Sequence, residues 1–126
     1  MSRDSICLAT LIQQHRADVG SLSRFYPLSA SQIRIERFDR LYADWEVRLA
    51  EIDPEGLDST NQLDLALLKN HLAFGRSRLA IEAGVKAELR KTLPFADGII
   101  ALEEARMRMD EIDPVAAAQT VAALAE

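Results

Sequence analysis

The sequence is poor in the residues that cross-link proteins or bind transition metals. Its 126 residues include one cysteine, Cys7, and two histidines, His15 and His71. One cysteine excludes an intrachain disulfide, and one thiol with two imidazoles is too few for a four-ligand structural zinc site. Cys7 lies among apolar residues and is expected to be a small core residue. The same cysteine usage fits a reducing compartment, so we expect a cytoplasmic protein.

Basic residues are also in the minority. Lys and Arg number 15 against 20 Asp and Glu, a formal net charge of −5, and the cations alternate with acids along the chain. A nucleic-acid surface needs clustered positive charge, so we expect no nucleic-acid partner. No stretch approaches the roughly 20 apolar residues of a membrane span. The short apolar run 6–12 is followed by polar residues where a signal peptide would be cleaved, so we expect no signal peptide and no membrane partner.

Apolar residues at helical spacing dominate what remains. Hydrophobic residues make up 48% of the sequence, which is enough for the core of one domain. The most regular stretch, 29–52, carries large apolar residues at alternating steps of three and four: Ile35, Phe38, Tyr42, Trp45, Leu49 and Ile52. This spacing predicts an amphipathic helix with Trp45 at the centre of its buried face. Ser29, with Gln32 three residues later, is expected to cap its start.

The other stripes and breaks predict an all-α fold. The expected helices, five in number, span residues 4–19, 30–52, 60–90, 98–112 and 114–125, and residues 20–28 form a loop. Ser59 is expected to cap the third helix, and Asp113 with Pro114 to begin the last. We expect one domain, 1–126, in which the second and third helices are long, antiparallel and amphipathic, with the shorter helices packed on them.

The third expected helix has apolar residues on two sides. One stripe consists of Leu65, Leu68, Leu72 and Leu79, and Gly75 stands where its next large residue would be. A glycine there is expected to let another backbone approach closely, and Gly84 predicts a bend or an early end. A second line consists of Leu67, Phe74, Ile81 and Val85. Apolar surface on two sides predicts dimers or weak oligomers if one side stays uncovered.

The residue types that carry catalysis are not grouped in the sequence. His15 and His71 lie on different expected helices, and neither has a neighbouring glutamate as in H-E-x-x-H zinc sites. His71 is expected to be partly exposed or hydrogen-bonded. The segment Gly75-Arg76-Ser77 lacks the second glycine of a G-x-S-x-G turn and lies inside a helical pattern. We therefore expect no catalytic, cofactor-binding or metal-binding residue in this chain.

An acidic cluster near the C-terminus is the remaining candidate for a cation site. It consists of Glu103, Glu104, Asp110, Glu111 and Asp113, with Arg106 and Arg108 between them. Because Glu104 and Arg108 are four residues apart on one expected helix, they are expected to form an ion pair. A solvated, salt-bridged face explains the cluster without a bound cation.

Two blocks of the sequence resemble a known family. They read FDRLYADWEVRLAEIDPEGLDSTNQLDLALLKNHL and LPFADGIIALEEARMRMDEIDPVAAAQTVAALAE. Their order is similar to a tryptophan helix, an "idp…Ls…q.DyaLLrnhL" segment, then "LPFa..Ii.L.eaR" and "dp..aA". These patterns are typical of the N-terminal helical region of the family catalogued as domain of unknown function 885. The resemblance covers residues 25–126, so the helix predicted within the first 24 residues is supported by periodicity alone.

The resemblance implies a position in a larger architecture. Members of this family are longer and look like zinc-dependent metallopeptidases, with a later helix of the form H-E-A-Y-P-G-H. This chain contains no such motif. The resemblance therefore implies a non-catalytic N-terminal helical module, with zinc bound only in the complete architecture and the C-terminal portion as a partner. The alternative is a free-standing helical interaction module that associates through its apolar faces.

The scarcity of ligands gives a first testable expectation. The purified chain should bind no zinc stoichiometrically and hydrolyse no peptide, because a catalytic zinc needs about three protein ligands with a base nearby. Elemental analysis after dialysis against a weak chelator measures this. One zinc retained per chain would contradict the expectation.

Overall fold

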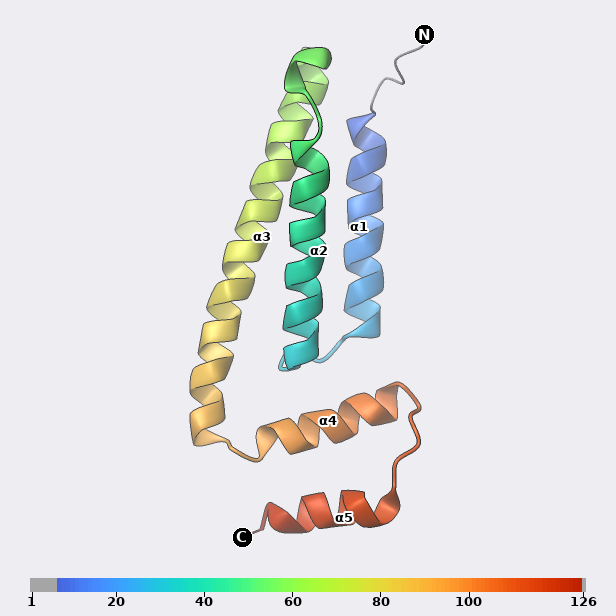
Figure 1. Ribbon diagram of the computed structural model, residues 1–126, viewed down its shortest axis with the longest axis vertical. Helices are drawn as coiled ribbons and strands as arrows, with labels where there is room; N and C mark the ends of the chain where they lie inside the picture. The colour runs from blue at the N-terminus through green and yellow to red at the C-terminus, as the bar shows by residue number, and fades with distance from the viewer. Residues whose placement is uncertain (1–6, 126) are drawn as a thin grey trace.

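The computed structural model describes residues 7–125, and within that range the chain is all α-helical, with no β-strand (Figure 1). The five α-helices are α1 (Leu8–Phe25), α2 (Gln32–Ala50), α3 (Ser59–Thr92), α4 (Ala96–Met107) and α5 (Pro114–Ala123), and a short 3-10 helix, η1 (Pro54–Gly56), precedes α3. The prediction of five helices is confirmed. So is the prediction that the second and third are long and in contact. None of the described helices is long and apolar enough to cross a bilayer.

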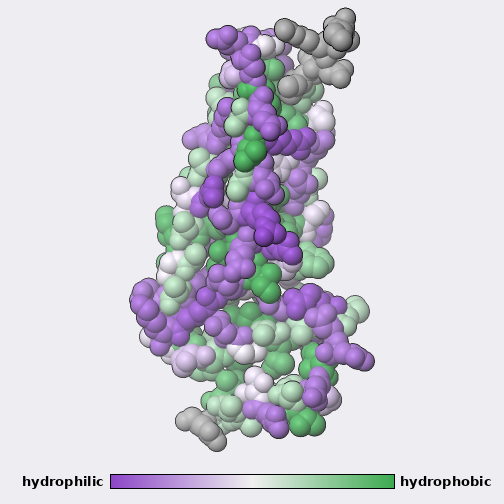
Figure 2. Space-filling model, viewed as in Figure 1, coloured by the Kyte–Doolittle hydropathy of each residue, from purple (hydrophilic) through white to green (hydrophobic). Residues whose placement is uncertain are grey.

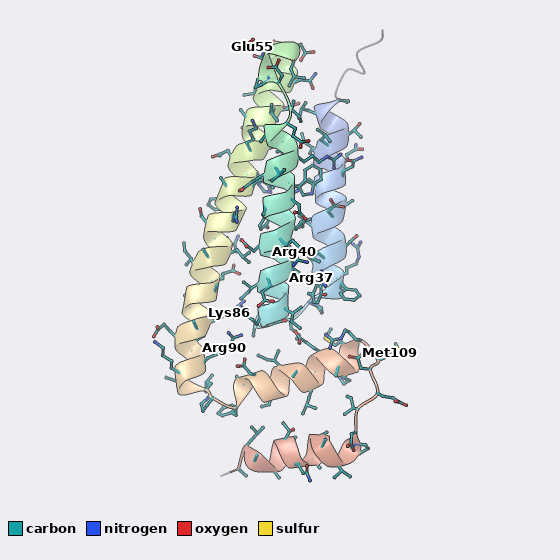
Figure 3. The ribbon with its side chains drawn as sticks, viewed as in Figure 1. Arg37, Arg40, Glu55, Lys86, Arg90 and Met109 are labelled. Carbon is teal, nitrogen blue, oxygen red and sulfur yellow. The ribbon has the colours of Figure 1, made fainter. Side chains whose placement is uncertain are left out.

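The helices fall into two groups in space. Helices α1, α2 and α3 stand upright side by side, while α4 and α5 run crosswise below them (Figure 1). Each of α1, α2 and α3 contacts the other two. Arg90, labelled at the lower end of α3 in Figure 3, donates from Nε to Asp97 on α4 at 2.9 Å and from a terminal nitrogen to Gln32 on α2 at 3.0 Å. This guanidinium therefore joins the two groups.

The core lies where α1, α2 and α3 meet. Its larger cluster consists of Leu8, Trp45, Leu49, Ile52, Leu65, Leu68 and Leu72, and its smaller one of Ile35, Phe38 and Leu79. Trp45 is buried, as predicted, and its indole Nε1 donates a hydrogen bond to an Asp18 carboxylate oxygen at 3.0 Å. The bond satisfies the one polar atom of the indole, so the largest side chain of the protein is buried without an orphaned donor.

Two of the predicted helix caps are wrong by one or two residues. Ser31, not Ser29, accepts the hydrogen bond of the Arg34 amide at 3.2 Å, because residues 29 and 30 form a turn that precedes α2. Asp58, not Ser59, caps α3 by accepting from the Asn61 amide at 2.8 Å. In each case a second capping residue stood close by in the sequence, and the path of the incoming chain decides between them.

The first helix also differs from its prediction. Helix α1 continues through Gly20 to Phe25, so the stop predicted after residue 19 and the loop predicted from residue 20 are wrong. Val19 and Leu22 pack against the smaller core cluster, and this contact offsets the low helix propensity of glycine. Residues 4–6 of the predicted helix lie outside the described range.

The later breaks show the same competition between local signals and packing. Helix α3 passes Gly84 without ending and reaches Thr92. Helix α4 begins two residues earlier than predicted and ends at Met107, five residues before the predicted end, because Met109 adopts a left-handed φ of 56°. The predicted start of α5 is confirmed, since the Asp113 carboxylate accepts from the Val115 amide at 3.0 Å.

Gly75 provides a close approach, although not to a backbone as predicted. A Cβ at this position would lie 3.1 Å from Cζ of the Tyr42 ring. The glycine therefore lets the hydroxyl end of an aromatic side chain of α2 pack closely against α3.

Trp45→Ala should lower the free energy of unfolding by about 3–5 kcal/mol, because it removes the largest buried side chain and leaves a cavity. Val47→Ala is the matched control on the same helix: Val47 is 63% exposed, and a surface substitution of this kind changes stability by roughly 0.5 kcal/mol at most. Urea denaturation of both variants gives the comparison. Similar midpoints for the two would show that Trp45 is not central to the core.

Candidate functional site

The structure brings the two histidines together. The rings of His15 on α1 and His71 on α3 are 5.8 Å apart between centroids and nearly perpendicular. The indole of Trp45 packs edge-to-face with His15, at 5.2 Å between ring centroids. Sequence reasoning placed the histidines on separate helices and did not foresee this contact. The one available signal was that His15 falls on the apolar stripe of the first helix.

His15 is buried and chemically isolated. The residue is 2% exposed, and neither ring nitrogen has a hydrogen-bond partner among the protein atoms. Burial lowers the pKa of His15, the neighbouring His71 lowers it further, and Asp18 opposes the shift. Asp18 accepts the indole hydrogen bond of Trp45 and makes none with His15. The imidazole is therefore kept neutral by its surroundings and lacks the orienting partner that a general base needs.

A cleft beside the histidine pair has an apolar character. It encloses about 320 Å³ between α1 and α3 and is lined by Ile12, His15, Arg16, Asp64, Leu67, Leu68 and His71. Asp64 precedes His71 by two helical turns, about 10 Å along α3, so the two side chains cannot readily share a metal ion. In the described part of the chain no three His, Cys, Asp or Glu side chains converge as metal ligands.

The other candidates from the sequence are equally unsupported as catalytic groups. Ser77 lies exposed within α3, and the structure pairs it with no base. Cys7 is exposed at the start of α1, so its prediction as a core residue is wrong. Hydrogen bonding to Thr10 lowers the pKa of the Cys7 thiol. His71, which was predicted to be partly exposed or hydrogen-bonded, is exposed.

The acidic cluster is a salt-bridged surface, as predicted, with different partners. Arg106 donates from Nε to Glu103 at 2.9 Å, and Arg108 pairs with Asp110 at 3.0 Å. The predicted pair of Glu104 and Arg108 is not formed, because the Arg108 guanidinium pairs with Asp110, which follows the end of α4. Glu104 instead turns inward, with one carboxylate oxygen buried and unpaired.

The most extensive functional candidate is a surface and not a catalytic centre. Five large apolar side chains on the outward side of α3, which we call the outer stripe, are between 55% and 68% exposed: Leu63, Leu67, Phe74, Ile81 and Val85. The stripe lies on the opposite side of α3 from the buried leucines that pack on α2. Four of its five members were predicted as a second apolar line, and Leu63 was missed.

Further apolar residues gather at the lower end of the molecule. Figure 2 shows them over α4 and α5. They include Ile99 on α4 and Val115 and Val121 on α5, each at least 45% exposed. This surface is made by two short helices with few contacts to the bundle, whereas the outer stripe belongs to a helix fixed in the core.

Comparisons with protein-family models, with curated proteins and with solved structures find no match for this chain. The resemblance described from the sequence remains a prediction.

The burial of His15 makes stability depend on pH. Because its pKa is lower in the folded protein, the unfolded chain takes up a proton first as the pH falls through the ordinary histidine range near 6.5. The stability present above that range should therefore decrease on acidification. His15→Leu should make the fall in unfolding free energy between pH 7 and pH 5 less steep.

His71→Gln is the control for this measurement. His71 is exposed, and burial is the main cause of the His15 shift, so this variant should keep most of the pH dependence. Chemical denaturation at several pH values tests both variants. Equal slopes for the wild type and His15→Leu would show that His15 does not carry the effect.

Proposed function

We propose that this chain is a non-catalytic helical docking module, which binds another polypeptide along the outer stripe of α3. One observation carries the proposal. The stripe runs over 23 residues of one helix, from Leu63 to Val85, and each of its five large side chains is more than half exposed. Soluble monomers seldom expose so many large apolar side chains along one side of a helix unless it is a contact surface.

The surface is held in place before any partner arrives. Arg76 of α3 bonds to Asp39 at 3.1 Å and to Glu46 at 2.8 Å, both on α2. Together with the leucines buried beneath them, these bonds fix α3 against α2. A preformed surface loses little conformational entropy on binding, which favours a role in recognition.

The arrangement of reactive groups supports a role without catalysis. The one buried imidazole, His15, has no polar partner, and two acidic residues of α4, Glu103 and Asp97, are paired with arginines. No described group of nucleophile, base and orienting residue lies within hydrogen-bonding reach. The residues of the outer stripe are apolar and offer binding area but no chemistry.

The family resemblance suggests what the module belongs to. If it holds, the chain is the N-terminal helical module of a metallopeptidase-like protein, whose helices line or cover the cleft of the complete enzyme. The support is the ordered match of sequence blocks between residues 25 and 126. The alternative, a free-standing interaction module, needs only the outer stripe. An H-E-x-x-x-G-H segment in the reading frame downstream of Glu126 would favour the first.

The docking role can be tested with one charge placed on the stripe. The tagged chain is co-expressed with a metallopeptidase-like C-terminal portion that carries the H-E-x-x-x-G-H helix, and the complex is isolated by the tag. Phe74→Glu should abolish any complex, because burying a carboxylate in an apolar contact is unfavourable. Val47→Glu, at a valine of α2 with a similar exposed fraction, should not.

Self-association is measured in parallel for the same three proteins. A complex with either partner that is sensitive to Phe74→Glu supports the docking role. If neither the C-terminal portion nor a second copy binds, or if Val47→Glu weakens binding as much as Phe74→Glu, the outer stripe is not a docking surface.

A further inference from the structure

We propose that the outer stripe pairs with the same stripe of a second copy, with the two α3 helices antiparallel and Phe74 on the twofold axis. The inference rests on the proposed docking function and names its partner. It starts from the spacing of the stripe, which is the same in both directions from its centre.

Phe74 is the midpoint of the stripe. Leu67 and Ile81 are each seven residues from it, and Leu63 and Val85 are each eleven residues from it. Steps of seven and eleven residues correspond to about two and three helical turns, so all five side chains stay on one side of α3. When two such helices run antiparallel about Phe74, Leu67 meets Ile81 of the second copy and Leu63 meets Val85.

This symmetry favours a second copy over an unrelated partner. A twofold interface requires that residue i of one copy meets residue j of the other and that j meets i. The five residues of the outer stripe meet that requirement. Leu89, farther along α3, has no such counterpart and instead lines a cleft with Ala96 and Ile100 of α4. An unrelated partner would impose no such symmetry on the spacing.

The polar residues within the stripe obey the same symmetry. Asn70 and Arg78 lie four residues on either side of Phe74. Antiparallel pairing therefore sets the Asn70 amide of each copy opposite the Arg78 guanidinium of the other copy. The amide oxygen can accept a hydrogen bond from the guanidinium, so the dimer contains two such bonds. Within each copy Arg78 also forms an ion pair with Glu82, one turn along α3, at 3.5 Å.

One flank of the stripe allows the helices to approach closely. Ala66, Ala73 and Ala80 recur every seven residues beside the large side chains and are exposed. Small residues at a helix contact shorten the distance between the axes. The stripe and this flank form a patch of several hundred Å² per copy, below the about 800 Å² per partner of a standard interface. The dimer should therefore be reversible and form at micromolar concentrations.

Disulfide cross-linking in a Cys7→Ser background tests the register. Phe74→Cys should form a covalent dimer on mild oxidation, because the two residues meet on the axis. Ile81→Cys alone should not, since its two copies lie fourteen residues apart along the paired helices, about 21 Å. The double variant Leu67→Cys and Ile81→Cys should cross-link, because the cysteine at position 67 of each copy meets the cysteine at position 81 of the other.

The outcomes separate this inference from the docking role. Ile81→Cys alone cross-linking as readily as the double variant would overturn the antiparallel register. Sedimentation showing a monomeric wild type at about 0.5 mM would overturn the dimer. In that case a complex with the C-terminal portion that is still sensitive to Phe74→Glu would leave the docking role in place.

Leu67→Glu is a second test of the interface, in case Phe74→Glu disrupts association for a reason other than its charge. It carries the same charge at another exposed position of the stripe and should also give a monomer. Val47→Glu should sediment like the wild type. Helical circular dichroism at wild-type intensity establishes that each variant is folded.

Discussion

The packing of α2 against α3 decides which apolar residues of this chain are buried and which remain at the surface. Helix α3 carries apolar residues on two sides, and α2 can cover only one of them. The buried leucines of α3 meet the stripe of α2 that is centred on Trp45. Every large apolar residue on the far side of α3 is then left exposed by the same contact that stabilises the bundle.

Helix α1 is held by apolar side chains such as Leu8 and Leu22 and, in addition, by an aromatic contact. Helix α1 places His15 between Trp45 of α2 and His71 of α3, and Asp18 accepts the indole hydrogen bond. A histidine in such a place looks at first like a functional group. Because it is buried without a polar partner, its role is structural, and it lowers the free energy of unfolding when the pH falls. These polar and aromatic groups thus contribute to packing, and the outer stripe of α3 is the surface that we propose for recognition.

Much of the fold follows from the sequence because its signals are periodic. The stripe around Trp45, the Asp113 cap and most of the outer stripe are repeats of helical spacing or local capping, and each is present in the structure. The errors arise where a local signal competes with packing at a distance. Gly20 predicts a helix stop, but Leu22 packs against the smaller core cluster and the helix continues. The contact between His15 and His71 depends on how two helices sit against each other, which spacing within one helix does not contain.

The central claim is that the outer stripe pairs antiparallel with the same stripe of a second copy, and a distance between copies tests it most directly. A spin label attached at Val85→Cys in the Cys7→Ser background reports that distance by pulsed electron paramagnetic resonance. In the antiparallel pair the two labelled positions are 22 residues apart along the helices, so we expect a separation of about 33 Å. A separation of about 10 Å, the distance between helices in contact side by side, would mean a parallel pair. That result, or no dipolar coupling at concentrations where the chain should be dimeric, would contradict the account.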